Sequence, residues 1–121
     1  MLDTERIDAQ RLFFGKQNPL SIKYRKKALK RLQKTVIRYE NDIAKALEAD
    51  LHKSAYESYL TEIGFVRSEL RQAIAQLKKW ATPKRVRTPF LLMGTTSSIT
   101  YQAYGNVLIL APWNYPFQLL F

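Results

Sequence analysis

Two prolines bracket a Trp-Asn-Tyr triplet in the segment Ala111-Pro112-Trp113-Asn114-Tyr115-Pro116-Phe117. The segment follows directly on Val107–Leu110, a run with the composition of a strand buried on both faces. Proline stops the hydrogen-bond ladder of a strand, and α/β sheets bind ligands at the carboxyl ends of their strands. The amide of Asn114 can there donate two N–H bonds to an oxygen that gains negative charge, as in an oxyanion hole. The alternative is that Asn114 only supports the turn, as asparagine often does.

Cysteine and histidine limit the other chemistry that these residues can perform. The chain has no cysteine and one histidine, His52. A disulfide scaffold, a thiolate zinc site and a cysteine nucleophile are therefore excluded within these 121 residues. We expect no metal site. His52 falls at the end of a predicted helix, where it can interact with the helix dipole, and no nucleophile accompanies it.

The charge of the chain is strongly positive. Twenty basic residues against ten acidic residues give a net charge of +10, and no acidic residue lies between Lys23 and Arg38. Such a bias is typical of proteins that bind nucleic acid or an anionic surface, and it also occurs where an acidic partner surface is missing. Because no zinc finger, stacking platform or recognition-helix pattern accompanies the charge, we expect no specific nucleic-acid partner.

The first part of the sequence predicts four helices. The first begins at Asp3 or Thr4 and ends at Gly15, before a turn at Asn18-Pro19. The other three begin near Ser21, near Asn41 and at the capping-box pattern Ser54-Ala55-Tyr56-Glu57. Thr82-Pro83 ends the last and longest of them. Apolar residues recur along that helix at steps of four and three, and we expect this stripe to be buried: Tyr56, Leu60, Ile63, Val66, Leu70, Ile74, Leu77 and Ala81.

Strand patterns follow the helices. Alternation over Ile99–Tyr104 predicts an exposed strand, and Val107–Leu110 predicts a central strand. The fold class is therefore mainly α, four helices followed by β-strands. No apolar stretch approaches the roughly 20 residues that cross a bilayer, and the polar start does not match a signal peptide. We expect a cytoplasmic protein without a transmembrane segment.

The stretch from Tyr104 to Phe117, with its Trp-Asn-Tyr-Pro-Phe turn, resembles the NAD(P)-dependent aldehyde dehydrogenase family. Ala49-Asp50-Leu51-His52-Lys53 is similar to the Asp-Leu-x-Lys signature of the same family, and the class 3, fatty-aldehyde-like branch fits best. The resemblance implies an incomplete piece of the α/β aldehyde dehydrogenase fold. It divides the chain into a helical segment of a Rossmann-like cofactor domain (1–82), an extended segment with an oligomerisation-arm strand (83–104), and the first strand and turn of the cofactor domain (105–121).

The resemblance also implies roles for four residues of the turn. Asn114 matches the asparagine that stabilises the oxyanion, Pro112 and Trp113 match positions lining the cofactor cleft, and Tyr115 matches an aromatic bordering the substrate tunnel. In such enzymes a cysteine thiolate adds to the aldehyde, NAD or NADP takes up a hydride, and water hydrolyses the thioester. The implied function is oxidation of an aldehyde to a carboxylic acid.

The nucleophilic cysteine, the general-base glutamate and the Gly-rich pyrophosphate loop of the family do not occur in these 121 residues. The resemblance therefore implies the N-terminal part of such an enzyme, inactive as this chain alone. Its partners would be the aldehyde substrate and either a second copy or the remainder of the enzyme. The alternative is a free-standing basic helical module that binds an acidic protein or nucleic acid through residues 23–38.

Overall fold

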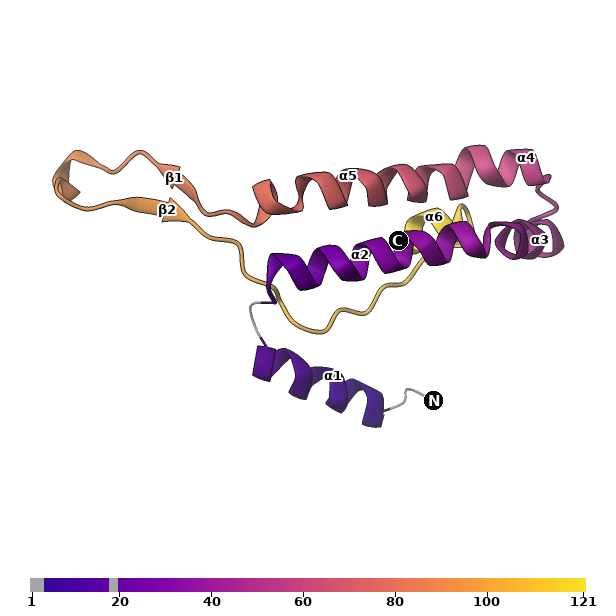
Figure 1. The fold of residues 1–121 in the computed structure, drawn as a ribbon, viewed down its shortest axis with the longest axis horizontal. Helices are drawn as coiled ribbons and strands as arrows, with labels where there is room; N and C mark the ends of the chain where they lie inside the picture. The colour runs from indigo at the N-terminus through magenta and orange to yellow at the C-terminus, as the bar shows by residue number, and fades with distance from the viewer. Residues whose placement is uncertain (1–3, 18–19) are drawn as a thin grey trace.

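The computed structural model of the chain describes residues 4–17 and 20–121. Its first half is helical, as the sequence predicts (Figure 1). The helices are α1 (Thr4–Gln17), α2 (Ile22–Arg38), α3 (Glu40–Leu51), α4 (Ala55–Ser58), the π-helical segment η1 (Tyr59–Ile63) and α5 (Gly64–Ala81). α4, η1 and α5 follow one another without a break and form the one long helix predicted from Ser54 to Thr82. The class predicted from the sequence, helices followed by strands, is confirmed.

Helix boundaries follow the predicted capping residues in most places. The Ser21 hydroxyl accepts the N–H of Tyr24 and the Ser54 hydroxyl accepts that of Glu57, each at 3.2 Å. Thr82 is extended, as expected of a residue before proline. The predicted end of the first helix at Gly15 is wrong, because α1 continues to Gln17. The Asp3 cap and the Asn18-Pro19 turn lie outside the described residues.

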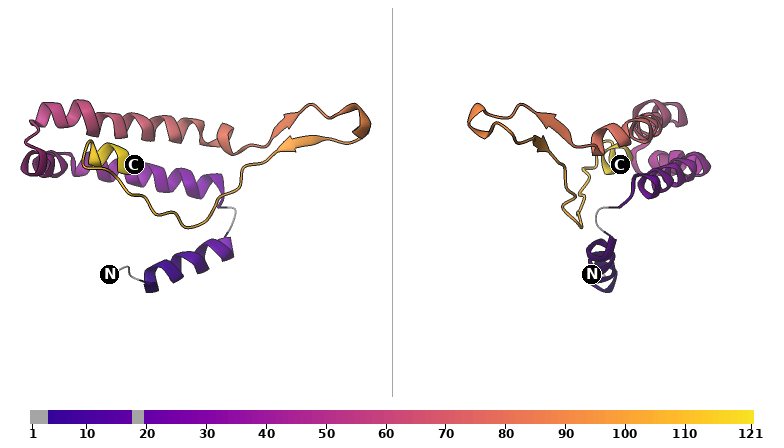
Figure 2. Two further views of the ribbon diagram at one scale, coloured as in Figure 1. Left: turned by 180° about the vertical axis from the view of Figure 1, so that it is seen from behind. Right: turned by 60° about the vertical axis from the view of Figure 1, so that its left-hand side comes forward.

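The core lies between α2 and the long helix, which run side by side (Figures 1 and 2). Val36 of α2 packs in one cluster with Ile63, Val66 and Leu70. Partly buried side chains surround this cluster: Leu29, Leu32, Ile43, Ala44 and Phe117. Burying each large aliphatic side chain contributes about 1.5–3 kcal/mol, so this cluster is what holds the helices together.

The π-helical segment η1 changes which residues face the core. Ile63, Val66, Leu70 and Leu77 of the predicted stripe are buried, but Tyr56 and Leu60 are exposed. A π-helical turn inserts an extra residue into the helix, so residues before it are rotated relative to those after it. Ser58 and Glu62 are fully buried instead. The expectation that the stripe is buried at Tyr56 and Leu60 is therefore wrong.

A hairpin projects away from the helices (Figure 2). Strand β1 (Lys84–Val86) pairs antiparallel with β2 (Ser97–Ile99), with Lys84 opposite Ile99, and the 3-10 helix η2 (Phe90–Leu92) lies near the tip. The predicted strand at Ile99–Tyr104 is displaced, because β2 ends at Ile99 and residues 100–104 form no strand. In the register of this hairpin, Thr100 would pair with Pro83. Because proline has no N–H to donate, the pairing does not continue beyond Lys84 and Ile99.

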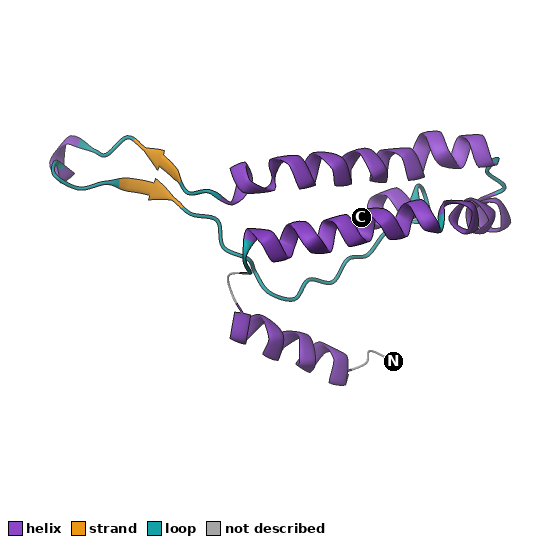
Figure 3. Ribbon diagram, viewed as in Figure 1, coloured by secondary structure: helices purple, strands orange, loops and turns teal. Residues whose placement is uncertain are grey.

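A long loop leads from β2 to the short helix α6 (Pro116–Leu120) and passes beneath α2 (Figures 1 and 3). Val107–Leu110 lies in this loop, exposed and without strand structure, so the expectation of a buried strand is wrong for this chain. A strand needs hydrogen-bonding neighbours, and the described residues offer this run none. The Asn106 amide donates to the carbonyl of Ile7 at 3.2 Å, which joins the loop to α1.

Candidate functional site

The carboxylate of Glu62 joins the long helix to the turn that precedes α6. Its Oε2 accepts the backbone N–H of Phe117 at 2.8 Å and that of Gln118 at 3.4 Å. Its Oε1 accepts a hydrogen bond from Lys53 Nζ at 2.5 Å. Glu62 is fully buried, and a buried carboxylate is stable only where donors surround it. Here an ammonium group and two backbone amides supply those donors.

Lys53 links the same carboxylate to the aromatic ring of the turn. Its side chain is 12% exposed and its Nζ lies 4.3 Å from the centre of the Tyr115 ring. A cation above an aromatic face is attracted by the ring quadrupole, more strongly where water is excluded. Lys53 therefore contacts Glu62 and Tyr115 together, although the three residues come from different parts of the sequence.

The backbone of the turn is unusual at Tyr115. This residue has φ 53° and ψ 52°, in the left-handed region, and among the described residues the only other non-glycine residue with positive φ is His52. Such a conformation costs about 1–3 kcal/mol and persists only where the surroundings determine it. His52 precedes Lys53 in the chain and Tyr115 contacts its side chain. Both strained positions thus adjoin one lysine.

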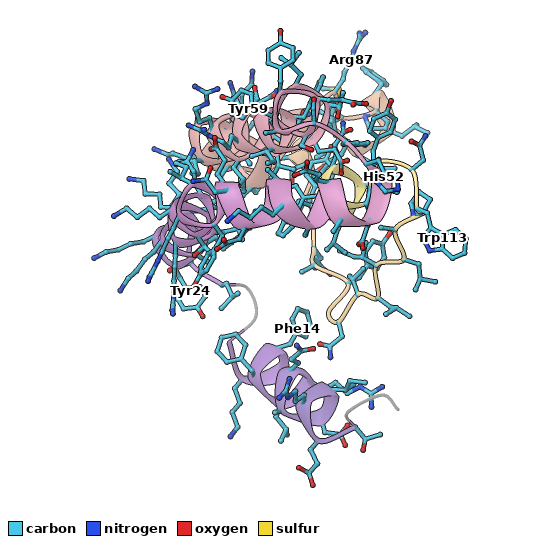
Figure 4. All side chains as sticks on the ribbon, turned by 90° about the vertical axis from the view of Figure 1, so that its right-hand side faces the viewer. Phe14, Tyr24, His52, Tyr59, Arg87 and Trp113 are labelled. Atoms are coloured by element: carbon cyan, nitrogen blue, oxygen red, sulfur yellow. The ribbon has the colours of Figure 1, made fainter. Side chains whose placement is uncertain are left out.

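The predicted site residues are exposed to solvent. Pro112, Trp113 and Asn114 are exposed, and the Trp113 side chain points away from the helices (Figure 4). The Asn114 side chain makes no hydrogen bond to any residue that the structure describes. Tyr115 is 37% exposed and its ring faces Lys53. The four predicted residues are therefore consecutive on one exposed segment. Lys53 contacts the Tyr115 ring, and Glu62 accepts the N–H of Phe117 just beyond the segment.

Surface hollows lie elsewhere. One of about 490 Å³ lies between α1 and residues 105–107, and one of about 470 Å³ lies along α2. Neither is lined by Pro112, Trp113, Asn114 or Tyr115. Within the described ranges, no group of three or more metal-ligating side chains gathers, and no helix has the length and apolarity to cross a membrane.

Sequence reasoning missed the residues that support the turn. Lys53 appeared only as part of the Asp-Leu-x-Lys signature, and Glu62 was not among the predicted site residues. A weak signal was present, because Glu62 lies four residues before Val66 and therefore beside the predicted apolar stripe. An acidic residue on an apolar helix face indicates a buried charge with a partner.

Known proteins resemble this chain over most of its length. The model of the aldehyde dehydrogenase family matches residues 5–121. The 4,4'-diaponeurosporen-aldehyde dehydrogenase of Staphylococcus aureus (strain NCTC 8325 / PS 47) is 47% identical over 109 residues, which cover 90% of this chain and 24% of that protein. The 4,4'-diapolycopene-4,4'-dial dehydrogenase of Cytobacillus firmus is 40% identical over 82% of this chain and 22% of its own length. The dimeric NADP-preferring aldehyde dehydrogenase of Canis lupus familiaris is 35% identical over 87% of this chain and 23% of its own length.

A solved structure has the same fold. It is described as the substrate bound state of Staphylococcus aureus AldH and superposes with a TM-score of 0.89 at 43% identity, over 98% of this chain and 26% of that one. The chain thus spans about a quarter of the length of these relatives and forms a fragment of their fold. With its family model matched from residue 5 to residue 121, the chain belongs to the aldehyde dehydrogenase family.

Proposed function

We propose that this chain is the N-terminal part of an enzyme that oxidises an aldehyde to a carboxylic acid with NAD or NADP, and that Asn114 is its oxyanion donor. The observation that carries the proposal is the state of the Asn114 side chain. It is exposed and makes no hydrogen bond to the described residues, while Glu62 holds the backbone beyond it. An asparagine that merely supported its own turn would use its side chain for that purpose.

Addition of a thiolate to an aldehyde requires such a hydrogen-bond donor. When a thiolate adds to a carbonyl carbon, an electron pair moves onto the oxygen, and N–H groups already in place stabilise the charge. These 121 residues contain no cysteine, so the thiolate would come from another part of the enzyme. Asn114 would contribute its amide N–H to the oxyanion, and the neighbouring Tyr115 would border the path of the substrate.

Pro112 and Trp113 are the proposed contacts of this chain with the cofactor. Both are exposed, and Trp113 presents 90% of its surface to solvent. A proline ring and an indole ring are flat apolar surfaces against which a planar ring can lie, so the residues present fit a share of a cofactor cleft. NAD or NADP, when bound, supplies the two-electron oxidant. The part of this chain is to shape one wall of the cleft and exclude water from it.

A chimaera tests the proposed role of Asn114. Residues 5–121 replace the matching part of the Staphylococcus aureus relative, and the aldehyde named in that relative serves as substrate. We expect the chimaera to reduce NAD or NADP, and we expect Asn114→Ala to lower turnover by about 10²–10³-fold, the usual effect of removing one oxyanion donor. The matched control is Asn41→Ala in α3, also an exposed asparagine, which should leave turnover unchanged.

Two further results bear on the proposal. The 121-residue chain alone should give no absorbance rise at the reduced-nicotinamide band, because it contains no thiol nucleophile. An active chimaera in which Asn114→Ala retains full turnover would contradict the oxyanion role. Reproducible turnover by the purified chain alone would contradict the proposed division of catalytic groups.

The hairpin supports a proposal about assembly. Its tip carries apolar side chains that are largely exposed, among them Phe90 at 82% and Leu91 at 94%. Contiguous exposed apolar surface marks an interaction site. We propose that the extended segment 83–104 is an oligomerisation arm that pairs with a second copy or with the remainder of the enzyme.

The basic surface of α2 favours a second candidate function. Eight lysine and arginine residues lie on α2 between Lys23 and Arg38, and none of them takes part in an ion pair with the described residues. This surface could serve an acidic protein or a nucleic acid. It would equally suit an acidic surface on the rest of the enzyme, and the salt dependence of oligonucleotide binding separates a nucleic-acid function from the other two.

A further inference from the structure

We propose that Lys53 and Glu62 are positioning residues, which hold the Trp113–Tyr115 turn in the conformation that presents Asn114. Neither residue touches the groups proposed to react. They act through the backbone of α6 and the ring of Tyr115. The inference rests on the proposed role of Asn114 for its catalytic meaning, whereas the contacts themselves can be tested without substrate or cofactor.

The start of α6 requires an acceptor from elsewhere in the chain. The first backbone amides of a helix have no partner within the helix, and a capping side chain normally accepts them. Tyr115 occupies the capping position and makes no such bond, and Pro116 has no N–H. The N–H groups of Phe117 and Gln118 therefore depend on Glu62, which lies 55 and 56 residues earlier in the sequence.

The long helix places Glu62 where this contact is possible. Glu62 lies within η1, and its neighbour Ile63 belongs to the same apolar cluster that Phe117 contacts. Phe117 is thus held twice, by its side chain against the core and by its N–H on the Glu62 carboxylate. Because only Pro116 separates the turn from Phe117, the position of the turn is defined relative to the most buried part of the molecule.

Lys53 completes the arrangement by balancing the charge. A fully buried carboxylate without a counter-ion is expensive, and removal of one partner from a buried pair leaves the other uncompensated. The ammonium of Lys53 neutralises Glu62 and covers the Tyr115 ring on the same side. The residue that stabilises Glu62 is therefore also the one that fixes the side chain next to Asn114.

Glu62→Gln in the full 121-residue chain tests the proposal. Lys53 donates to one carboxylate oxygen, and Phe117 and Gln118 donate to the other. In glutamine an NH₂ group replaces one of these oxygens, so its N–H groups would face either Lys53 or the two backbone amides. We expect exchange of the Phe117 amide hydrogen to become about ten- to a hundredfold faster, as for a lost charge-assisted hydrogen bond. The three-bond coupling between the amide and α protons of Tyr115 should also move away from the value of a left-handed backbone.

Three further variants keep the result decisive. Lys53→Met should alter the Tyr115 coupling and speed exchange at Phe117, whereas Lys53→Arg should retain the original values because it keeps the charge. The matched control is Arg67→Met, which breaks the 2.7 Å ion pair of the same long helix with Glu40 and should leave Tyr115 and Phe117 unchanged. If Glu62→Gln loses its helical structure, the comparison of Lys53→Met with Lys53→Arg tests the proposal instead.

The overturning result is equally specific. If Lys53→Met and a folded Glu62→Gln both keep the Tyr115 coupling and the exchange rate of Phe117, the turn is held by other contacts and the proposal is wrong. None of these readouts involves catalysis. A failure here would therefore leave the proposed role of Asn114 standing, and an inactive chimaera would leave the positioning contacts standing.

Discussion

The backbone N–H of Gly64 donates to the carbonyl oxygen of Tyr59, five residues earlier in the chain. This bond defines the π-helical turn, and it brings the Tyr59 oxygen close to the α-carbon of Gly64. A β-carbon at position 64 would lie 2.8 Å from that oxygen. The π-helical turn, which rotates Glu62 into the protein interior, therefore needs glycine at its end.

Gly64→Ala should destabilise the chain, contrary to the usual effect in a helix. Alanine normally stabilises a helix interior by about 0.5–1 kcal/mol relative to glycine. At Gly64 the contact with backbone must be relieved by a shift of the helix, and we expect a net loss of about 1–3 kcal/mol in the free energy of unfolding. Thermal denaturation followed by circular dichroism measures this loss.

Gly15→Ala is the matched control. Nothing lies within 4 Å of a β-carbon at position 15 in α1, so alanine there should show the ordinary helix-stabilising effect. Equal melting temperatures for Gly64→Ala and the unaltered chain would contradict the tight contact at Tyr59.

Ile63→Ala and Leu60→Ala test which face the π-helical turn buries. Ile63 is fully buried, and its truncation should cost about 2–5 kcal/mol because it leaves a cavity. Leu60 is 49% exposed, so its truncation should cost clearly less. Urea denaturation of the two variants compares the losses directly. A larger loss at Leu60 would restore the stripe that the sequence alone predicts.

The comparison of Leu60 with Ile63 also shows how far the sequence could predict the fold. Helix positions and most ends follow from local signals, such as the Ser21 and Ser54 caps, and these are confirmed. The π-helical turn is not indicated by the spacing of the apolar residues, and Gly64 at its end only permits it. Its position decides that Glu62 is buried and that Leu60 is not.

The candidate site shows the same division between local and distant causes. Chemical type and spacing lead to the prediction of Asn114 and its turn, and the family resemblance supplies the roles predicted for Pro112, Trp113 and Tyr115. Its supports, Lys53 and Glu62, lie 50 or more residues earlier and meet the turn only through folding. The strand expected at Val107–Leu110 fails for a related reason: its composition fits a central strand, but a strand also requires neighbours, and the described residues supply none.

The basic surface of α2 should bind nucleic acid weakly and lose it with salt. A protein that makes 6–10 phosphate contacts loses about 10³–10⁵ in affinity between 50 and 200 mM salt. We expect this behaviour with a random oligonucleotide, measured by fluorescence anisotropy. Lys27→Gln and Lys30→Gln on the exposed side of α2 should each reduce the salt slope by about 1, whereas Lys45→Gln on α3 should change it less.

A different outcome would change the assignment of this surface. Sequence-selective binding that persists at physiological salt would make α2 a nucleic-acid reader and favour the second candidate function. Binding that disappears with salt leaves the surface as one suited to an acidic protein or to the remainder of the enzyme.

The last prediction concerns the loop that carries Val107–Leu110. Its apolar side chains are exposed, with Val107 at 73% and Leu110 at 84%, and its backbone has no strand partner among the described residues. Each large apolar side chain gains about 1.5–3 kcal/mol when fully buried, and unpaired backbone groups favour pairing with another chain. We therefore expect the full chain to self-associate through residues 98–121, in a manner that depends on concentration.

Light scattering measures this self-association, with two variants beside the full chain. A chain ending at Thr82 should scatter as a smaller species, and Leu108→Lys combined with Leu110→Lys should reduce association while keeping α6 against Glu62. The double variant is the sharper control, because truncation also removes Phe117 from the core. If the full chain is a monodisperse monomer whose amides at 107–110 resist hydrogen exchange, these residues fold back onto the helices. The exposed run would then not be an association surface, because the helices would already cover it.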